Sequence, residues 1–148
     1  MRRHPDWAKY HLISEPHNYH ETQVSLPYSV AISLIEGKAF FEQYSDDKVK
    51  DQRVLELAKK VNVTADQSLP RGVSCAMEIR MSDGAVYTSQ VDYAKGSLEN
   101  PMTDEERKDK FQSLASGILS EKKRAAIISM VDGLDELKDM SELCKFLY

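Results

Sequence analysis

The sequence predicts an α+β fold in which helices precede a small antiparallel sheet with a hairpin and further helices follow it. Three observations support this prediction. Apolar residues recur at helical spacing over residues 27–61, alternate with polar residues over 73–81, and return to helical spacing after residue 103. No block of the sequence is repeated, so a repeat architecture is not expected.

Residues 1–26 are predicted to form an irregular N-terminal segment. Prolines, histidines and aromatic residues follow one another there, with neither a helical nor a strand period as far as Val24. A folded domain rarely opens with so long a stretch of this kind. We therefore expect the segment to lean on another part of the protein.

Residues 27–102 are predicted to form an α+β domain that opens with a buried helix. Pro27 suits a first helical turn, because its missing N–H is not needed there. The residues from Tyr28 to Ile35 are apolar around nearly the whole circumference, which is typical of a buried helix. Gly37 fits the left-handed residue that ends many helices.

Two further helices are expected before the sheet. The first is a short one over residues 38–44. The second is capped by Asp46 or Asp47, carboxylates that can accept a hydrogen bond from a free N–H group of the first turn. Its apolar face consists of Val54, Leu55, Leu57, Ala58 and Val61.

A hairpin is expected next. Residues 73–81 alternate as a half-buried strand does, and Asp83-Gly84 suits the two positive-φ positions of a tight turn. Residues 85–93 return as the partner strand, and residues 61–64 are expected to add a third, shorter strand.

Residues 103–148 are predicted to be C-terminal helices. Thr103 with Glu106 forms a capping box, and Ser120 and Gly133 suit the two ends of a second helix. A last short helix begins at Ser141. The apolar residues expected to face inward are Phe111, Leu114, Ala115, Ile118, Ile127, Ile128, Val131, Leu143, Phe146 and Leu147.

The composition argues against nucleic-acid and membrane partners. The net charge is −4 and the two signs are interleaved, so the chain offers no positive field to a phosphate backbone. Residues 1–12 lack the apolar core of a signal peptide, and no apolar run approaches the roughly 18 residues of a membrane helix. We therefore expect a cytoplasmic location.

The histidines do not predict a metal site. All four precede Glu21, and His17 with His20 is the pair that a metal would use. No cysteine or carboxylate lies at a recognisable ligand spacing from them, so a surface or substrate-facing role is favoured. The two cysteines, Cys75 and Cys144, are expected to be small core residues.

Other catalytic patterns are missing or have plainer explanations. Acidic groups at 46–47, 104–106 and 132–136 lie where helices are predicted to start, and free N–H groups favour carboxylates there without catalysis. There is no G-x-S-x-G, no phosphate-binding glycine loop and no G-x-G-x-x-G. Serine hydrolysis and nucleotide binding are therefore not expected.

Tyr28 allows two interpretations. In the first turn of a buried helix its hydroxyl needs a partner, and a helix start favours anions. The tyrosine could then donate a hydrogen bond or a proton to an acidic substrate. Alternatively, it is a packed core residue bonded to a backbone carbonyl.

Four segments, in the same order along the chain, resemble one enzyme family. Residues 20–47 read HETQVSLPYSVAISLIEGKAFFEQYSDD, close to S-[LI]-x-Y-x-[VA]-A-x-[AS]-L-[LI]-x-G followed by an aromatic-rich helix and acids. VLELAKKVNV at 54–63, the hairpin over 73–93 and GSLENPMTDEERKDKF at 96–111 follow. Together they resemble the C-terminal part of the 2-methylcitrate dehydratase-like (MmgE/PrpD) family.

The resemblance implies a fold and a chemistry. Family members have a large helical domain and a smaller α+β lid, with the active site between them, and this chain would be the lid with the closing helices. Members act without metal or organic cofactor on small polycarboxylates: they dehydrate 2-methylcitrate, decarboxylate cis-aconitate or epimerise iminodisuccinate. Such reactions need a base, a matched acid, and cations or N–H groups to hold carboxylates.

The resemblance also implies site residues. Tyr28 matches a tyrosine that lines the active site of decarboxylase members, and His20 matches a histidine upstream of it. The family's other catalytic residues, including histidines, an aspartate and the lysine of a K-x-x-x-x-H element, have no counterpart here. This departure puts independent catalysis by the chain in question.

Two hypotheses follow. In the first, the chain is the C-terminal portion of a cofactor-independent lyase or isomerase for small di- or tricarboxylic acids, completed by a helical domain or a separate subunit. In the second, it is a non-catalytic α+β module that self-associates through exposed helical surface, over residues 28–35 and along the terminal helices. A homo-oligomer is expected.

Overall fold

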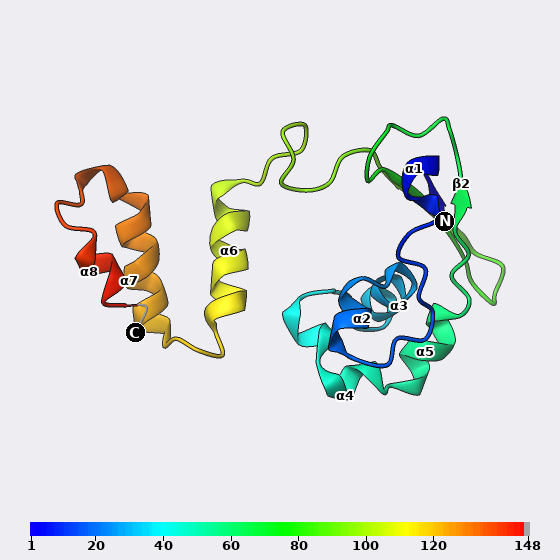
Figure 1. Cartoon of the computed structure of the whole chain (residues 1–148), viewed down its shortest axis with the longest axis horizontal. Coiled ribbons are helices and arrows are strands. Elements are labelled where there is room, and N and C mark those ends of the chain that lie inside the picture. The colour runs from blue at the N-terminus through cyan, green and yellow to red at the C-terminus, as the bar shows by residue number, and fades with distance from the viewer. Residues whose placement is uncertain (147–148) are drawn as a thin grey trace. The chain divides into compact units, whose positions relative to one another are not determined.

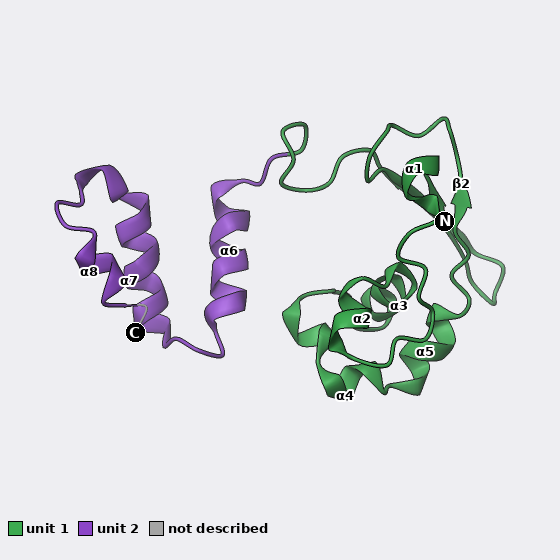
Figure 2. Cartoon of the chain, viewed as in Figure 1, with its two compact units in different colours: residues 1–100 green, residues 101–148 purple. Residues whose placement is uncertain are grey.

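The computed structural model describes residues 1–146 and confirms the α+β class (Figure 1). The chain divides into two compact units, Met1–Asn100 and Pro101–Tyr148 (Figure 2). Unit 1 contains a small sheet and a group of helices, and the described part of unit 2 is helical. Among the described residues, no helix has the length and apolar character that crossing a membrane requires.

The helices of unit 1 all lie within residues 5–58. They are α1 (Pro5–Ala8), α2 (Tyr19–Gln23), α3 (Leu26–Glu36), the 3-10 helix η1 (Phe41–Tyr44), α4 (Asp46–Val49) and α5 (Gln52–Ala58). The predicted ends of α3 are confirmed: Pro27 lies in its first turn, and Gly37 has the left-handed φ of 73°. The helix predicted over 38–44 is reduced to the single turn of η1.

The core of unit 1 lies between α3 and α5. Five side chains form it, each at 0% exposure: Tyr28, Ala31, Ile32, Val54 and Ala58. Leu34, on the far side of α3, is 47% exposed. The prediction that α3 is buried on all sides is therefore wrong, because α5 covers only one face of the helix.

Asp51, and not Asp46 or Asp47, caps α5. Its carboxylate accepts a hydrogen bond from the backbone N–H of Arg53 at 3.0 Å. Asp46 and Asp47 belong instead to the first turn of the separate helix α4. The chain makes an additional turn here because residues 50–51 break the helix before α5 begins.

The sheet has four strands in the order β2-β1-β3-β4. The strands are β1 (Arg2–Arg3), β2 (Thr64–Ala65), β3 (Cys75–Arg80) and β4 (Val86–Val91). The hairpin pair β3–β4 is antiparallel, as predicted, and so is β1–β3. The pair β1–β2 is parallel, so the sheet is mixed.

The hairpin loop differs in detail from the predicted turn. Only Gly84 has a positive φ, 90°, and Asp83 does not. The Gly84 N–H donates to the carbonyl of Met81 at 3.1 Å, and the Met81 N–H donates to Ala85 at 2.8 Å. A loop with one left-handed glycine after a turn is a common alternative to the two-residue loop.

The N-terminal segment is more regular than the sequence predicts. Within residues 1–24 lie β1, α1 and α2, and β1 occupies an inner position of the sheet. Backbone bonds fix β1 to β2: the Thr64 N–H donates to Met1 at 3.0 Å, and the Asp66 N–H donates to Arg3 at 2.9 Å. The segment does lean on another part of the chain, which is the sheet of its own unit.

Unit 2 begins with the predicted capping box. Thr103 accepts from the Glu106 N–H at 3.1 Å and the Glu106 carboxylate accepts from the Thr103 N–H at 2.8 Å, starting α6. The described elements of this unit are α6 (Asp104–Ala115), α7 (Glu121–Asp132), the 3-10 helix η2 (Leu134–Glu136) and α8 (Ser141–Cys144). Ser120 caps α7 as predicted.

The apolar residues of unit 2 are less buried than predicted. Ala115 is 9% and Ile127 is 6% exposed, but Leu114 is 50% exposed. Ile118 lies beyond the end of α6 and is 85% exposed. The predicted inward position of Leu147 falls outside the described residues. Two short helices cover only a narrow strip of each other, which leaves the rest of their apolar surface open.

Candidate functional site

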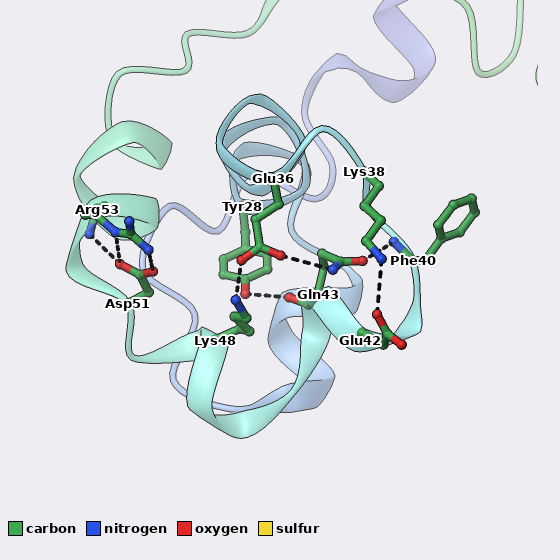
Figure 3. A network of polar contacts seen from close by, with 9 residues as sticks. All are labelled: Tyr28, Glu36, Lys38, Phe40, Glu42, Gln43, Lys48, Asp51 and Arg53. Carbon is green, nitrogen blue, oxygen red and sulfur yellow. Dashed lines mark hydrogen bonds and ion pairs between the residues drawn. The ribbon is translucent and has the colours of Figure 1, made fainter. Parts of the chain in front are cut away.

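Tyr28 lies inside the helical core. The side chain is 0% exposed, and its hydroxyl donates a hydrogen bond to the backbone carbonyl of Gln43 at 2.8 Å (Figure 3). The ring packs near that of Tyr44, with 5.9 Å between centroids. This geometry is the alternative that the sequence left open, a packed tyrosine bonded to a backbone carbonyl.

A network of polar side chains surrounds the Tyr28 hydroxyl (Figure 3). Gln43 is 2% exposed; its amide nitrogen donates to Glu36 at 3.0 Å and its amide oxygen accepts from the Phe40 N–H at 3.1 Å. Glu36 also forms an ion pair with Lys48, and the Lys48 hydrogen bond holds the pKa of Glu36 below its usual value. Each group in the network is thus bonded within the chain, as expected of a cluster that holds η1 and α4 against α3.

Burial raises the pKa of Tyr28 to about 12, with smaller contributions from Tyr44, Glu36 and Asp51. A general acid is most effective when its pKa is near the working pH. In this environment the Tyr28 hydroxyl is therefore a hydrogen-bond donor rather than a proton donor at neutral pH.

The shifted pKa predicts a loss of stability in alkaline solution. The stabilisation is fully present below the unfolded-state pKa of 10.0 and is lost as the pH rises toward the folded-state value of about 12. We expect the melting temperature of unit 1 to fall over this window, and to fall less in Tyr28→Phe. Melting curves of both proteins measured across the window test this. Equal slopes would contradict the burial of the hydroxyl.

The start of α3 does not offer the free N–H groups that an anion would need. The Leu26 N–H donates to the His11 carbonyl at 2.8 Å, and the Tyr28 N–H donates to the Ser25 hydroxyl at 3.0 Å. Pro27, between them, has no N–H group. The expectation that this helix end favours an anion at Tyr28 is therefore wrong, because the cap and the N-terminal segment use its donors.

His20 lies on α2, whereas the Tyr28 hydroxyl lies in the core. Its side chain is exposed, and its ring meets that of Tyr19 edge to face, with 5.5 Å between centroids. α2 packs on α3, η1 and α4. The structure therefore presents His20 to solvent and Tyr28 to the core. The catalytic roles expected for both residues stay predictions.

The acidic groups behave as structural residues. Asp104, in the first turn of α6, pairs with Arg107. Asp132 ends α7 instead of starting a helix, and it pairs with Lys108 at 2.5 Å. Within residues 1–146, no three His, Cys, Asp or Glu side chains are grouped so as to hold a metal ion.

A pocket of about 220 Å³ lies beside the start of α3. Its lining residues are Arg3, His11, Gln23, Val24, Ser25, Leu26 and Ser29. Arg3 comes from β1 and is 8% exposed, and its guanidinium makes one long bond, 3.4 Å, to the carbonyl of Trp7. No carboxylate of residues 1–146 forms an ion pair with it. A buried cation in a pocket is chemically suited to hold an anion.

His11, which shares this pocket, has an unusual backbone. Its φ of 62° makes it the one non-glycine residue with positive φ in the part of the chain described. Its ring stacks on Trp7, with centroids 6.4 Å apart and an interplanar angle of 14°. Strained residues of this kind cluster at functional sites.

No motif pointed to Arg3, and His11 was covered only by the expectation that the histidines face the surface or a substrate. The available signal was the row of charged, aromatic and histidine residues in HPDWAKYH, which carries no period and matches no motif.

Comparison with known proteins gives one family. The model of the MmgE/PrpD C-terminal domain matches residues 3–136. Similar curated proteins are the cis-aconitate decarboxylases of Mus musculus, 28% identical over 135 residues and covering 89% of this chain, and of Homo sapiens, 27% identical over 135 residues and also covering 89%. That of Aspergillus terreus is 29% identical over 131 residues and covers 84%. The matched part is only 28%, 28% and 26% of these relatives, respectively.

Proposed function

The chain belongs to the MmgE/PrpD family, because it matches the C-terminal domain of that family. From this premise we propose that it forms the C-terminal portion of a lyase for small di- or tricarboxylic acids. The observation that carries the proposal is the family match over residues 3–136. Because the similar relatives are named cis-aconitate decarboxylases, we favour decarboxylation over the dehydration of 2-methylcitrate.

Decarboxylation sets clear demands on the site. The bond between a carbon and its carboxylate breaks, CO₂ leaves, and the electron pair left on the carbon takes up a proton from an acid. The remaining carboxylates must be held by cations or N–H groups so that the breaking bond is correctly oriented. The chain supplies candidates for holding the substrate, and we propose that the missing acid and base lie in the rest of the enzyme.

We propose that a helical domain, encoded upstream or supplied as a separate subunit, completes the enzyme. The chain spans about a quarter of the length of its curated relatives, so most of a family enzyme lies outside it. Tyr28 and His20 are the residues proposed to join that domain at the active site. For Tyr28 this requires the hydroxyl to break its hydrogen bond to the Gln43 carbonyl and to donate to the substrate instead.

Reconstitution tests the proposal. Co-expressing the chain with the upstream helical part of the same enzyme should give CO₂ release from cis-aconitate, and either part alone should give none. Dehydration of 2-methylcitrate without decarboxylation would correct the reaction type. No turnover of either acid by a well-folded complex would refute the proposal.

A matched pair of variants then tests the role of Tyr28. Tyr28→Phe and Tyr44→Phe each remove one hydroxyl with a partner inside unit 1, Gln43 in one case and Ser29 in the other. If Tyr28 acts in catalysis, only Tyr28→Phe lowers kcat when both complexes are equally folded. Equal turnover of the two variants would assign Tyr28 to the core alone.

A second candidate function is self-association without catalysis. The observation in its favour is the apolar surface of unit 2, where Ile118 is 85%, Leu114 is 50% and Val131 is 48% exposed. On the surface first proposed, over residues 28–35, Tyr28, Ala31 and Ile32 belong to the core, whereas Leu34 is 47% exposed. This candidate would be favoured if the chain formed a stable oligomer in size-exclusion chromatography and its melting temperature did not change on adding citrate-like acids.

A further inference from the structure

We propose that the pocket beside the start of α3 is a carboxylate-binding site, with Arg3 as its anchor and His11 as its second donor. The ligand class is a small di- or tricarboxylate. This inference extends the proposed function and rests on it for one point, which is that the bound carboxylate is a substrate.

Within residues 1–146, Arg3 is a buried cation that forms no ion pair and a single hydrogen bond. It is 8% exposed, and its single hydrogen bond is the 3.4 Å contact from one guanidinium nitrogen to Trp7. Among the described residues, no polar side-chain atom is both buried from solvent and without a partner, so the guanidinium nitrogens that lack a protein partner reach the solvent of the pocket. An anionic ligand that enters the pocket would supply that partner.

The acidic groups nearest in the fold are already paired with other cations. Asp66, next to β1 through β2, binds Arg2 at 2.5 Å, and Asp6 binds Arg71 at 2.8 Å. Arg2 and Arg3 are adjacent in sequence, yet the Arg2 side chain is 57% exposed and paired whereas Arg3 is buried and is not. Arg2, at the surface, is therefore neutralised by Asp66, whereas the guanidinium of Arg3 can still bind an anion.

His11 brings a second donor to the same pocket. No hydrogen bond from its ring to another group is found among residues 1–146, and an imidazole keeps at least one N–H in either protonation state. Its left-handed backbone is held by the bond from the Leu26 N–H to its carbonyl at 2.8 Å, and its ring by the stack on Trp7. These contacts place the exposed ring of His11 beside Trp7 at the edge of the pocket.

The two serine hydroxyls of the pocket are bonded to other groups of unit 1. Ser25 donates to the Ile13 carbonyl and accepts from Tyr28, and Ser29 donates to the Ser25 carbonyl at 2.8 Å and accepts from Tyr44 at 3.0 Å. The planar fork of a guanidinium matches a carboxylate with two parallel hydrogen bonds. A volume of about 220 Å³ suits one arm of a polycarboxylate rather than a larger molecule.

Titration of the full chain with propane-1,2,3-tricarboxylate tests the site. This acid carries three carboxylates and no reactive double bond, and its trimethyl ester is the uncharged control. We expect the acid, and not the ester, to shift the NMR resonance of the Arg3 Nε–H and to raise the melting temperature. Because this readout uses the unaltered protein, it decides the question even if a variant fails to fold.

Arg3→Gln and Arg2→Gln form a matched pair for the same titration. Arg3→Gln removes a charged hydrogen-bond partner of the ligand, so we expect its affinity for the tricarboxylate to be at least about tenfold lower. The affinity of Arg2→Gln should stay within about twofold of that of the unaltered protein. Arg3→Lys, which keeps the charge but loses the fork, should fall between them. An unchanged Arg3 resonance, or an equal loss in Arg2→Gln, would overturn the proposal.

The two proposals fail separately. Turnover by the reconstituted enzyme without tricarboxylate binding at Arg3 would refute the site and leave the function standing. Binding at Arg3 without any turnover would keep the site and refute the function.

Discussion

Replacing Ile32 with alanine is expected to lower the free energy of unfolding of unit 1 by about 2–5 kcal/mol. Ile32 is 0% exposed and lies in the core between α3 and α5. Alanine loses the transfer free energy of the removed methyl and methylene groups and leaves a cavity that two packed helices cannot readily close. Denaturant unfolding followed by far-ultraviolet circular dichroism measures the change.

Leu34→Ala is the control for this prediction. Leu34 lies on the same helix, two residues away, but is 47% exposed, so its replacement should cost well under half as much. If the two variants lost equal stability, α3 would be covered on both faces, and another part of the protein would have to cover the face that Leu34 occupies here.

Ser25→Ala is expected to destabilise unit 1 by about 1–3 kcal/mol. Ser25 is 1% exposed and its hydroxyl makes two hydrogen bonds, accepting from the buried Tyr28 N–H and donating to the carbonyl of Ile13. The first bond caps α3, and the second ties the N-terminal segment to the helix. Alanine leaves the buried Tyr28 N–H without a partner and removes the tie to the Ile13 carbonyl. The same denaturant titration measures the loss.

Ser33→Ala separates this effect from the loss of a hydroxyl as such. Ser33, also on α3, donates at 2.7 Å to the carbonyl of Ser29 one turn earlier, a bond that adds little to a helix. We expect a change within about 0.5 kcal/mol. A cost in Ser33→Ala as large as in Ser25→Ala would show that the capping bond is not the cause.

The N-terminal segment links these predictions to the proposed site. The bond from Ser25 to Ile13 and that from Leu26 to His11 both hold residues 11–13 against the start of α3. The His11 ring and the pocket that it shares with Arg3 are positioned by the same contacts. Ser25→Ala should therefore also weaken the binding of a tricarboxylate, although Ser25 has no free donor for the ligand.

Both ends of α3, the start of α6 and the position of the hairpin were determined by the sequence. Pro27, Gly37 and the Thr103–Glu106 pair act on their own neighbours through φ preferences and short-range hydrogen bonds, so their effects can be predicted without knowing the fold. The strand alternation and Gly84 located the hairpin for the same reason. The family resemblance added the candidate residues, because Tyr28 lies in a motif of fixed spacing.

Only the tertiary structure decided which surfaces are covered and which charges are left without a partner. The strand β1 has two residues and therefore no period, and its place inside the sheet comes from bonds to residues more than sixty positions away. That placement buries Arg3 while leaving Arg2 paired at the surface. The hydrogen bond from the interior hydroxyl of Tyr28 to the Gln43 carbonyl likewise joins separate elements, and no local pattern of the sequence predicts it. Burial and pairing depend on contacts between distant segments, and a single sequence does not state those contacts.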